Sequence, residues 1–215
     1  MIIAIDGPSG AGKGTIAKKI AKKLNFTYID TGAMYRCVAL KSLKENLKIT
    51  DEDKIVDLLK NMDIKLTNDD KVYMDNEDVS EKIRSIEVTK RVSKISSIIP
   101  LREIMRQKQR EFAKKNSIVM EGRDITTEVF KDADYKFYLD TSIEERIKRR
   151  YLQNKEKNIK CTKEEIKQAI IERDNDDMNR KVGALRRTED QIYIDSSNMT
   201  IDEVVNKMLG VIKWI

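Results

Sequence analysis

Residues 2–15 read IIAIDGPSGAGKGT, and this stretch decides the fold. A short apolar run ends at Asp6, a glycine-rich turn follows, and a helical pattern then places Ile16 and Ile20 on one face. A buried strand that passes through such a turn into a helix presents backbone amides and a helix N-terminus to phosphate groups. The sequence therefore predicts a phosphate-binding loop at residues 7–15.

The loop also indicates which residues contact a nucleoside triphosphate. Its glycines let successive amides point inward, and Lys13 supplies a positive charge for the β- and γ-phosphates. Gly14 replaces the Ser or Thr that usually follows the lysine, so Thr15 is the candidate contact for Mg²⁺ and the direct metal ligands stay unassigned. The predicted ATP-binding residues are Gly7, Pro8, Ser9, Gly10, Ala11, Gly12, Lys13, Gly14 and Thr15.

Four more short apolar runs repeat the pattern of the first. They end at Asp30, Glu121, Asp140 and Asp195, and helical segments separate them. This alternation predicts an α/β fold of the P-loop NTPase type, with three layers around a five-stranded parallel sheet. Because ligands bind beyond the carboxyl ends of such strands, we expect the five terminal carboxylates to border the site. Asp140 and Asp195 also precede helix starts, where acids commonly act as caps.

Two regions interrupt the alternation of strands and helices. Residues 63–82 contain brief apolar runs around a turn at Asp75 and Asn76, which predicts short antiparallel strands in a small appendage. Residues 149–187 are very polar, and a segment that buries little apolar surface is a candidate mobile lid.

The residue composition excludes several kinds of chemistry. The chain has no histidine, which excludes Ser-His and Cys-His nucleophiles and histidine-based zinc sites. The two cysteines, Cys37 and Cys161, lie far apart and are interpreted as free thiols. Any reaction must therefore depend on Lys, Arg, Asp, Glu, backbone amides and a bound metal ion.

Charge and hydropathy limit the expected partners. The formal net charge is +6, but basic and acidic residues are interleaved, so we expect no nucleic-acid partner. No apolar run is long enough to span a membrane and the N-terminus lacks signal-peptide features, so we expect no membrane partner and a cytoplasmic protein. No unexplained apolar stripe remains on the helices, which favours a monomer.

Arginines near the strand ends indicate a phosphorylated acceptor. Transfer to a hydroxyl usually needs a positioned carboxylate, whereas transfer to a phosphate needs cations that bring two anions together. Arg36 and Arg123 follow the second and third strands, and Arg173 and Arg180 flank Asp177 at spacings of four and three, on one helix face. Each arginine alone could form a surface ion pair; the set beside a phosphate loop favours phosphate binding.

Seven stretches together carry a resemblance: IDGPSGAGKGT, YIDTGAMYR, SEKIRSIEVTKRVSKISSIIPLRE, EGRD, FYLDTSIEERIKRR, ERDNDDMNR and YIDSSNMTIDEV. In this order and spacing the chain resembles the bacterial cytidylate kinase family. The resemblance implies ATP-dependent phosphorylation of CMP and dCMP, with Mg²⁺ as cofactor. It also implies one P-loop kinase chain with a core at about 1–62, 93–148 and 188–215, a nucleoside monophosphate-binding insertion at about 63–92 and a lid at about 149–187.

The resemblance further implies roles for individual residues. Arg149 would support the transferring phosphoryl group when the lid closes, and Asp177 would contact the sugar or orient the lid arginines. The implied catalytic residues are Lys13, Arg123, Arg149, Arg173 and Arg180. The implied acceptor-binding residues are Thr31, Tyr35, Arg36, Ser93, Arg102, Glu121, Arg123, Asp124, Arg173, Asp177 and Arg180.

The chain departs from the family pattern at three places. Glu121 stands where the family often has Asp, Ala184 where it often has Pro, and Asp176 where relatives can carry Arg. Glu121 places its carboxylate one methylene further out at the expected sugar contact. Ala184, with Arg186 and Arg187 after it, changes the expected base pocket.

Other functions remain open at this point. One alternative is another P-loop small-molecule or nucleotide kinase, acting on UMP or on a hydroxyl acceptor, and convergence of Arg36, Arg102 and Arg123 would argue against a hydroxyl. A second is a nucleotide-gated switch, but its Asn-Lys-x-Asp base-reading motif is absent from the sequence.

Overall fold

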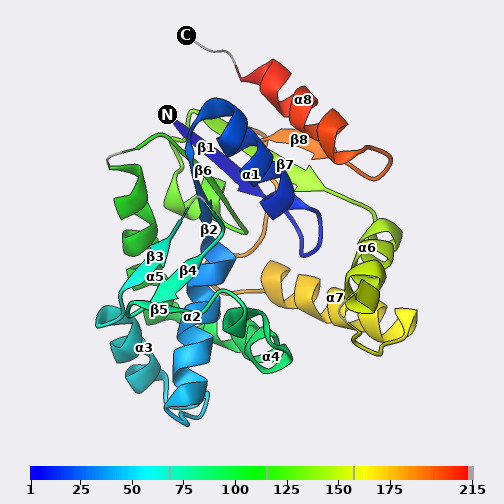
Figure 1. Ribbon diagram of the computed structural model, residues 1–215. Coiled ribbons are helices and arrows are strands. Elements are labelled where there is room, and N and C mark those ends of the chain that lie inside the picture. The colour runs from blue at the N-terminus through cyan, green and yellow to red at the C-terminus, as the bar shows by residue number, and fades with distance from the viewer. Residues whose placement is uncertain (68, 115, 157, 213–215) are drawn as a thin grey trace.

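The computed structural model describes residues 1–67, 69–114, 116–156 and 158–212. Its centre is a five-stranded parallel sheet in the order β2-β6-β1-β7-β8 (Figure 1). The strands are β1 (Ile2–Asp6), β2 (Thr27–Asp30), β6 (Ile118–Gly122), β7 (Tyr135–Asp140) and β8 (Ile192–Asp195). The predicted parallel sheet and α/β class are confirmed.

Helices cover both faces of the sheet, because residues of the central strand alternate between two buried clusters. Ile3 and Ile5 pack with the helices on one face, and Ala4 packs with those on the other. The helices are α1 (Lys13–Leu24) and α8 (Ile201–Val211) on the first face, and α2 (Thr31–Lys44), α3 (Glu52–Lys60), α4 (Ile86–Ile95) and α5 (Ile99–Ala113) on the second. The fold therefore has the predicted three layers.

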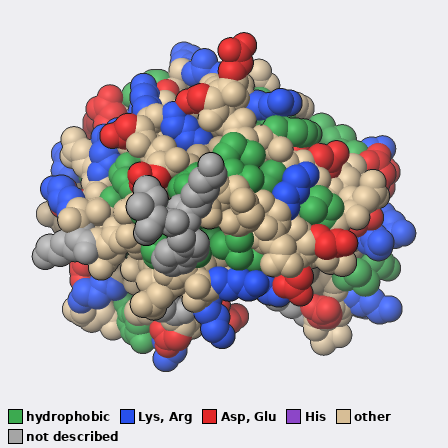
Figure 2. Space-filling model, turned by 90° about the horizontal axis from the view of Figure 1, so that it is seen from above, with side chains coloured by type: hydrophobic (Ala, Val, Ile, Leu, Met, Phe, Trp, Pro, Cys, Tyr) green, Lys and Arg blue, Asp and Glu red, His purple; other side chains and the backbone are tan. Residues whose placement is uncertain are grey.

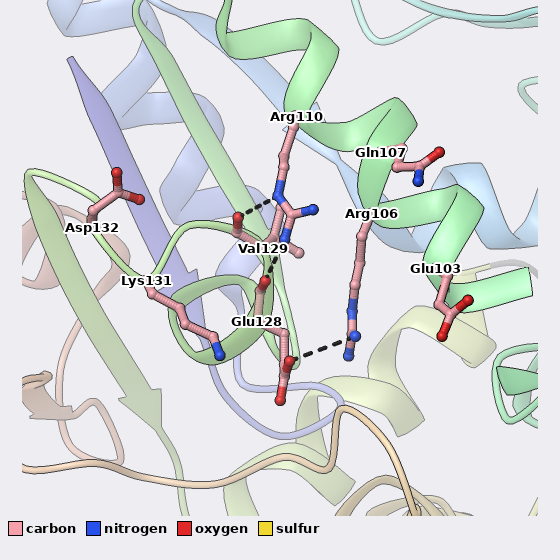
Figure 3. Close-up of a pocket in the computed structure, with 8 residues that line it drawn as sticks. All are labelled: Glu103, Arg106, Gln107, Arg110, Glu128, Val129, Lys131 and Asp132. Carbon is pink, nitrogen blue, oxygen red and sulfur yellow. Dashed lines mark hydrogen bonds and ion pairs between the residues drawn. The ribbon is translucent and has the colours of Figure 1, made fainter. Parts of the chain in front are cut away.

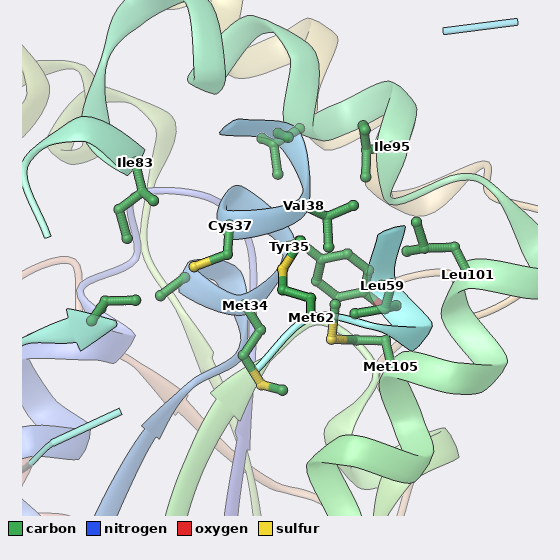
Figure 4. Close-up of a cluster of buried hydrophobic side chains, with 14 of the residues drawn as sticks. Met34, Tyr35, Cys37, Val38, Leu59, Met62, Ile83, Ile95, Leu101 and Met105 are labelled. Atoms are coloured by element: carbon green, nitrogen blue, oxygen red, sulfur yellow. The ribbon is translucent and has the colours of Figure 1, made fainter. Parts of the chain in front are cut away.

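The second cluster joins α2 to α5 (Figure 4). Met34 of α2, Leu101 and Met105 of α5 are at most 1% exposed. Full burial of each such side chain contributes about 1.5–3 kcal/mol to folding. This packing fixes α5 against the end of β6, where several of the predicted site residues lie.

The predicted antiparallel strands are β3 (Ile64–Leu66), β4 (Val72–Met74) and β5 (Glu77–Asp78), and they form a separate small sheet. Asp75 and Asn76 have φ angles of 52° and 67°, the left-handed values that a tight hairpin turn needs. Val72 and Met74 are buried in the same cluster as Met34, so this sheet is packed on the main core. The 3₁₀ helix η1 (Lys82–Arg84) follows it.

Helices α6 (Ile143–Glu156) and α7 (Lys163–Met178) pack against each other beside the sheet, and α7 reaches α4 (Figure 1). A capping box formed by Thr162 and Glu165 begins α7. Ile166 and Ile170 are the buried apolar residues of α7, whereas α6 buries Arg146. The pair therefore rests on charged contacts more than on apolar packing.

Basic and acidic side chains are interspersed over the face shown in Figure 2. Within the described ranges, every helix is too short or too polar to cross a bilayer.

Candidate active site

The phosphate-binding loop joins β1 to α1 through positions that favour glycine. Gly7 approaches β7 so closely that a Cβ would lie 2.1 Å from the carbonyl oxygen of Leu139. Gly10 and Gly12 have φ angles of 81° and 89°, which residues other than glycine rarely adopt. Among the residues that the structure describes, no side chain caps the N-terminus of α1 at Gly12, so its first amides are available to an anion.

Lys13 folds back into this loop. Its Nζ donates to the carbonyl oxygens of Gly7 at 2.9 Å and Pro8 at 2.8 Å, and the residue is 5% exposed. Burial and then the charge of Arg123 lower the pKa of Lys13. An anionic phosphate would be a stronger partner for the ammonium than two carbonyls, and it would restore the charged state.

Two arginines of α6 lie on the loop. Arg149 places Nη1 at 3.5 Å from the carbonyl oxygen of Ala11. Arg146, which the sequence analysis missed, donates to the carbonyl oxygen of Ser9 at 3.1 Å and pairs with Asp174 of α7. Its position three residues before Arg149 places it on the same helix face, and this spacing could have revealed it.

Three predicted arginines meet at one buried carboxylate. Asp177 is fully buried and accepts from Arg123 Nε at 2.6 Å, from Arg180 Nη2, and from Arg173 Nε at 3.3 Å. The side chains of Arg123 and Arg173 are 19% and 24% exposed, and no described residue accepts from the Nη2 atom of either. These terminal nitrogens are therefore free to bind a phosphate.

The charge of Asp177 holds this group together. Burial alone would raise the pKa of its carboxyl, but Arg123, Arg173 and Arg180 outweigh burial and lower the pKa to about 2. The carboxylate is ionised at neutral pH and has its oxygens committed to guanidinium groups. It orients the arginines, one of the two roles that the resemblance implied.

A second ion-pair group follows β6. Arg102 is 1% exposed and donates to Asp124 Oδ2 at 2.6 Å and to the carbonyl oxygen of Ser96 at 2.8 Å. Its guanidinium lies 5.7 Å from the ring centre of Tyr35. Arg106, one helical turn after Arg102, also donates to Asp124 Oδ2, at 3.1 Å, and was missed by the sequence analysis.

The ends of β2 and β6 carry a further pair of interactions. Thr31 donates to the carbonyl oxygen of Glu121 at 2.8 Å, and Arg36 pairs with Asp30 at 2.9 Å. Although burial opposes it, Arg36 holds the pKa of Asp30 below its usual value. Burial and then the neighbouring Asp30 charge raise the pKa of Glu121. Arg36, Arg102 and Arg123 thus pair with three separate carboxylates, which are Asp30, Asp124 and Asp177.

Ser93 connects α4 to α7. Its hydroxyl donates to Asp176 Oδ2 at 2.6 Å, in an exposed position. Asp176, where relatives can carry Arg, therefore binds a residue predicted to contact the acceptor.

The strand-end carboxylates divide by role. Asp6 accepts from the amides of Ile125 at 2.9 Å and Thr126 at 2.8 Å, and burial raises its pKa to about 6. Asp140 and Asp195 each accept a backbone amide just after their strand ends. Asp30, Asp140 and Asp195 thus each accept a local backbone amide, whereas Asp6 accepts amides of a segment more than 100 residues away; that all five acids border the site stays a prediction.

A magnesium ion would meet few protein ligands here. Within the described ranges, no group of three His, Cys, Asp or Glu residues could hold a metal ion. Thr15 is exposed in the first turn of α1, and its hydroxyl oxygen is a ligand type that Mg²⁺ accepts. The residues fit an ion held mainly by phosphate oxygens and water.

A model of the cytidylate kinase family matches residues 3–214 of the chain. The chain belongs to the cytidylate kinase family. Cytidylate kinase from Caldanaerobacter subterraneus is 47% identical, over 98% of this chain and 94% of that protein. Cytidylate kinase from Clostridioides difficile is 45% identical, over 98% of this chain and 97% of that protein. The predicted family and the predicted enzyme class, a phosphotransferase, are confirmed.

The fold recurs in a distant structure. An uncharacterized protein from Eubacterium ventriosum superposes with a TM-score of 0.55 at 14% identity. The superposition covers 98% of this chain and 97% of that chain. At this identity the likeness concerns the fold alone.

Proposed function

We propose that this chain transfers the γ-phosphoryl group of ATP to CMP and dCMP, forming CDP and dCDP. Family membership and the full-length similarity to cytidylate kinases support the reaction. The observation that carries the site assignment is the arrangement of Arg123, Arg173 and Arg180 around Asp177, within electrostatic reach of Lys13. Two reacting phosphate groups require cations on the donor side and on the acceptor side.

The donor would bind at the phosphate loop. Its amides and the uncapped N-terminus of α1 would hold the β- and γ-phosphates, and Lys13 would exchange its two carbonyl partners for phosphate oxygens. Thr15 would help to hold Mg²⁺, which would neutralise charge on the phosphates. Arg149, with Arg146 beside it, would contact the transferring group from α6.

The acceptor would bind between α2, α5 and α7. Arg123 and Arg173 would hold its phosphate through their free terminal nitrogens. Arg180, which binds Asp177 and the Ser96 hydroxyl, would help to hold Asp177 in place. Cytosine presents an amino donor, for which Asp124 is a matching acceptor. The remaining proposed contacts of the nucleotide are Thr31, Tyr35, Arg36, Ser93, Arg102 and Glu121.

Catalysis would consist of positioning and charge stabilisation. The attacking phosphate oxygen is already anionic, so no general base is required, and Asp177 is fully engaged with guanidiniums. We further propose that residues 149–187 form the lid and 63–92 the nucleotide-binding insertion of a cytoplasmic monomer whose partners are small-molecule nucleotides.

ADP formation from Mg-ATP, measured with CMP, dCMP, UMP, AMP, GMP and shikimate in turn, tests the proposal. Preference for CMP and dCMP is expected. Turnover with another monophosphate would keep the phosphate-acceptor assignment and discard the cytosine assignment. Turnover with shikimate alone would overturn both. The same panel with Lys13→Ala controls for a contaminating kinase.

A further inference from the structure

We propose that Arg106 is a positioning residue for recognition of the acceptor base, acting through Asp124. The inference rests on the proposed function, because it takes Asp124 as the acceptor of the cytosine amino group. It adds a residue that neither the sequence pattern nor the family resemblance assigned.

The geometry around Asp124 is asymmetric. Arg102 and Arg106 both donate to Oδ2, at 2.6 and 3.1 Å, whereas Oδ1 accepts no hydrogen bond from a described residue. Asp124 is 6% exposed. Two guanidiniums on one oxygen fix the plane of the carboxylate and leave the other oxygen as a charged acceptor for a ligand.

Gly183 lies close against the same carboxylate and against Arg102. A Cβ at Gly183 would lie 2.4 Å from Asp124 Oδ2, and its φ angle of 67° favours glycine. Gly183 follows α7 and lies within the proposed lid at residues 149–187, so this part of the lid covers the oxygen that the arginines hold. Oδ2 is thereby shielded, and Oδ1 is the atom left for recognition.

Arg106 holds Asp124 by linking two helices. Its Nη1 pairs with Glu128 at 3.5 Å, while its Nη2 binds Asp124, so it fixes both ends of the π-helix η2 (Ile125–Val129) to α5. Figure 3 shows Arg106 and Arg110 extending from α5 toward η2, at an open hollow of about 530 Å³. The two arginines differ in burial and in their second partner: Arg102 is 1% exposed and also binds the Ser96 carbonyl oxygen, whereas the Arg106 side chain is 12% exposed and also pairs with Glu128.

The decisive experiment compares Arg106→Gln with Arg110→Gln. Arg110 leaves the same helix and binds η2 through the carbonyl oxygens of Val129 at 2.9 Å and Glu128 at 2.7 Å, without touching Asp124. Arg106→Gln is expected to raise the KM for CMP about fivefold, with kcat and the KM for ATP within about twofold, because one of two charged hydrogen bonds to Asp124 is weakened. Arg110→Gln is expected to leave the KM for CMP unchanged, and Arg106→Lys to restore part of the loss.

A double-mutant cycle with Asp124→Asn separates positioning from a structural role. The asparagine presents an amide donor, so the CMP-to-UMP ratio of kcat/KM should fall, and adding Arg106→Gln should raise the KM for CMP no further. Additive effects, equal effects of Arg106→Gln and Arg110→Gln, or an unchanged KM in Arg106→Gln would each overturn the inference. An unchanged KM for CMP in Asp124→Asn would remove Asp124 from the acceptor site and the inference with it, while CMP-dependent ADP release would still report on the proposed reaction. Thermal unfolding of each variant identifies general destabilisation.

Discussion

The phosphate-binding loop and the arginine group around Asp177 hold anions by opposite means. The loop is nine consecutive residues, 7–15, and it offers backbone amides plus one lysine. The arginine group takes Arg123 from just after β6, Arg173 from α7 and Arg180 from just after α7, 50 or more residues from Arg123 in sequence, and offers guanidiniums fixed by a buried carboxylate. The loop is a local conformation, whereas the arginine group exists only while α7 is docked.

The difference explains why the two sites should respond differently to mutation. Apart from proline, no substitution removes a loop amide, so Lys13 is the residue whose side chain can be tested on the donor side. The arginine group distributes its charge over three side chains, and its common partner is a residue that would not touch the phosphate. Loss of Asp177 should therefore affect stability, whereas loss of Arg123 should affect the acceptor.

The largest expected effect is that of Lys13→Ala. Its Nζ contacts loop carbonyls and no core side chain, so the fold should persist while kcat falls by about a thousandfold or more. Single-turnover phosphoryl transfer and circular dichroism check both parts. Normal turnover in a folded variant would contradict the assignment of the loop.

Arg123→Ala should act on the acceptor side alone. We expect kcat/KM for CMP to fall by about a hundredfold, since a charged contact to phosphate is lost, with ATP affinity nearly unchanged. Calorimetric ATP binding and steady-state kinetics measure the two quantities. Equal losses of ATP binding and CMP turnover would place Arg123 on the donor side and remove the contrast between the two sites.

Asp177→Asn should lower the free energy of unfolding by about 2 kcal/mol at pH 7, the value of a pKa lowered from 3.8 to about 2. Because the native-state pKa is lowered, the ionised carboxylate contributes fully above about pH 4, and the contribution is lost as the pH falls toward 2. The difference between wild type and variant in urea unfolding should therefore shrink as the pH falls from about 4 to about 2.

A surface carboxylate is the matched control for Asp177. Asp57 pairs with Lys60 in an exposed position, and Asp57→Asn should change stability by less than about 0.5 kcal/mol. A pH-independent loss in Asp177→Asn would show that packing, not charge, is the cause.

Apart from the Asp57 control, the smallest expected effect is at the exposed contact between Ser93 and Asp176. Asp176→Ala should reduce stability by less than about 1 kcal/mol, because water replaces an exposed hydrogen bond at little cost. Urea unfolding of this variant, of Ser93→Ala and of the double variant would test it. A loss as large as that of Asp177→Asn would mean that α7 is docked chiefly through α4.

The sequence by itself determined the sheet, the loop and the family. Strand–turn–helix patterns are local, so the five strands and the cradle at residues 7–15 followed from contiguous residues. The facing of Arg173 and Asp177 followed from helical spacing, but the prediction that Arg180 shares their helix was wrong, because α7 ends at Met178 and Arg180 pairs with Asp177 from the segment after it. The seven motifs then specified the family, which the family model and the relatives confirm.

The tertiary structure decided which charges pair. Arg106 and Arg146 lie on helices whose apolar patterns do not predict which partners these arginines bind. Asp6 accepts hydrogen bonds from backbone amides of a segment more than 100 residues away. Sequence spacing fixes which side chains share one element's face, but ion pairing between elements depends on how those elements dock. The docking of α5 and α7 therefore decided which carboxylate each arginine met.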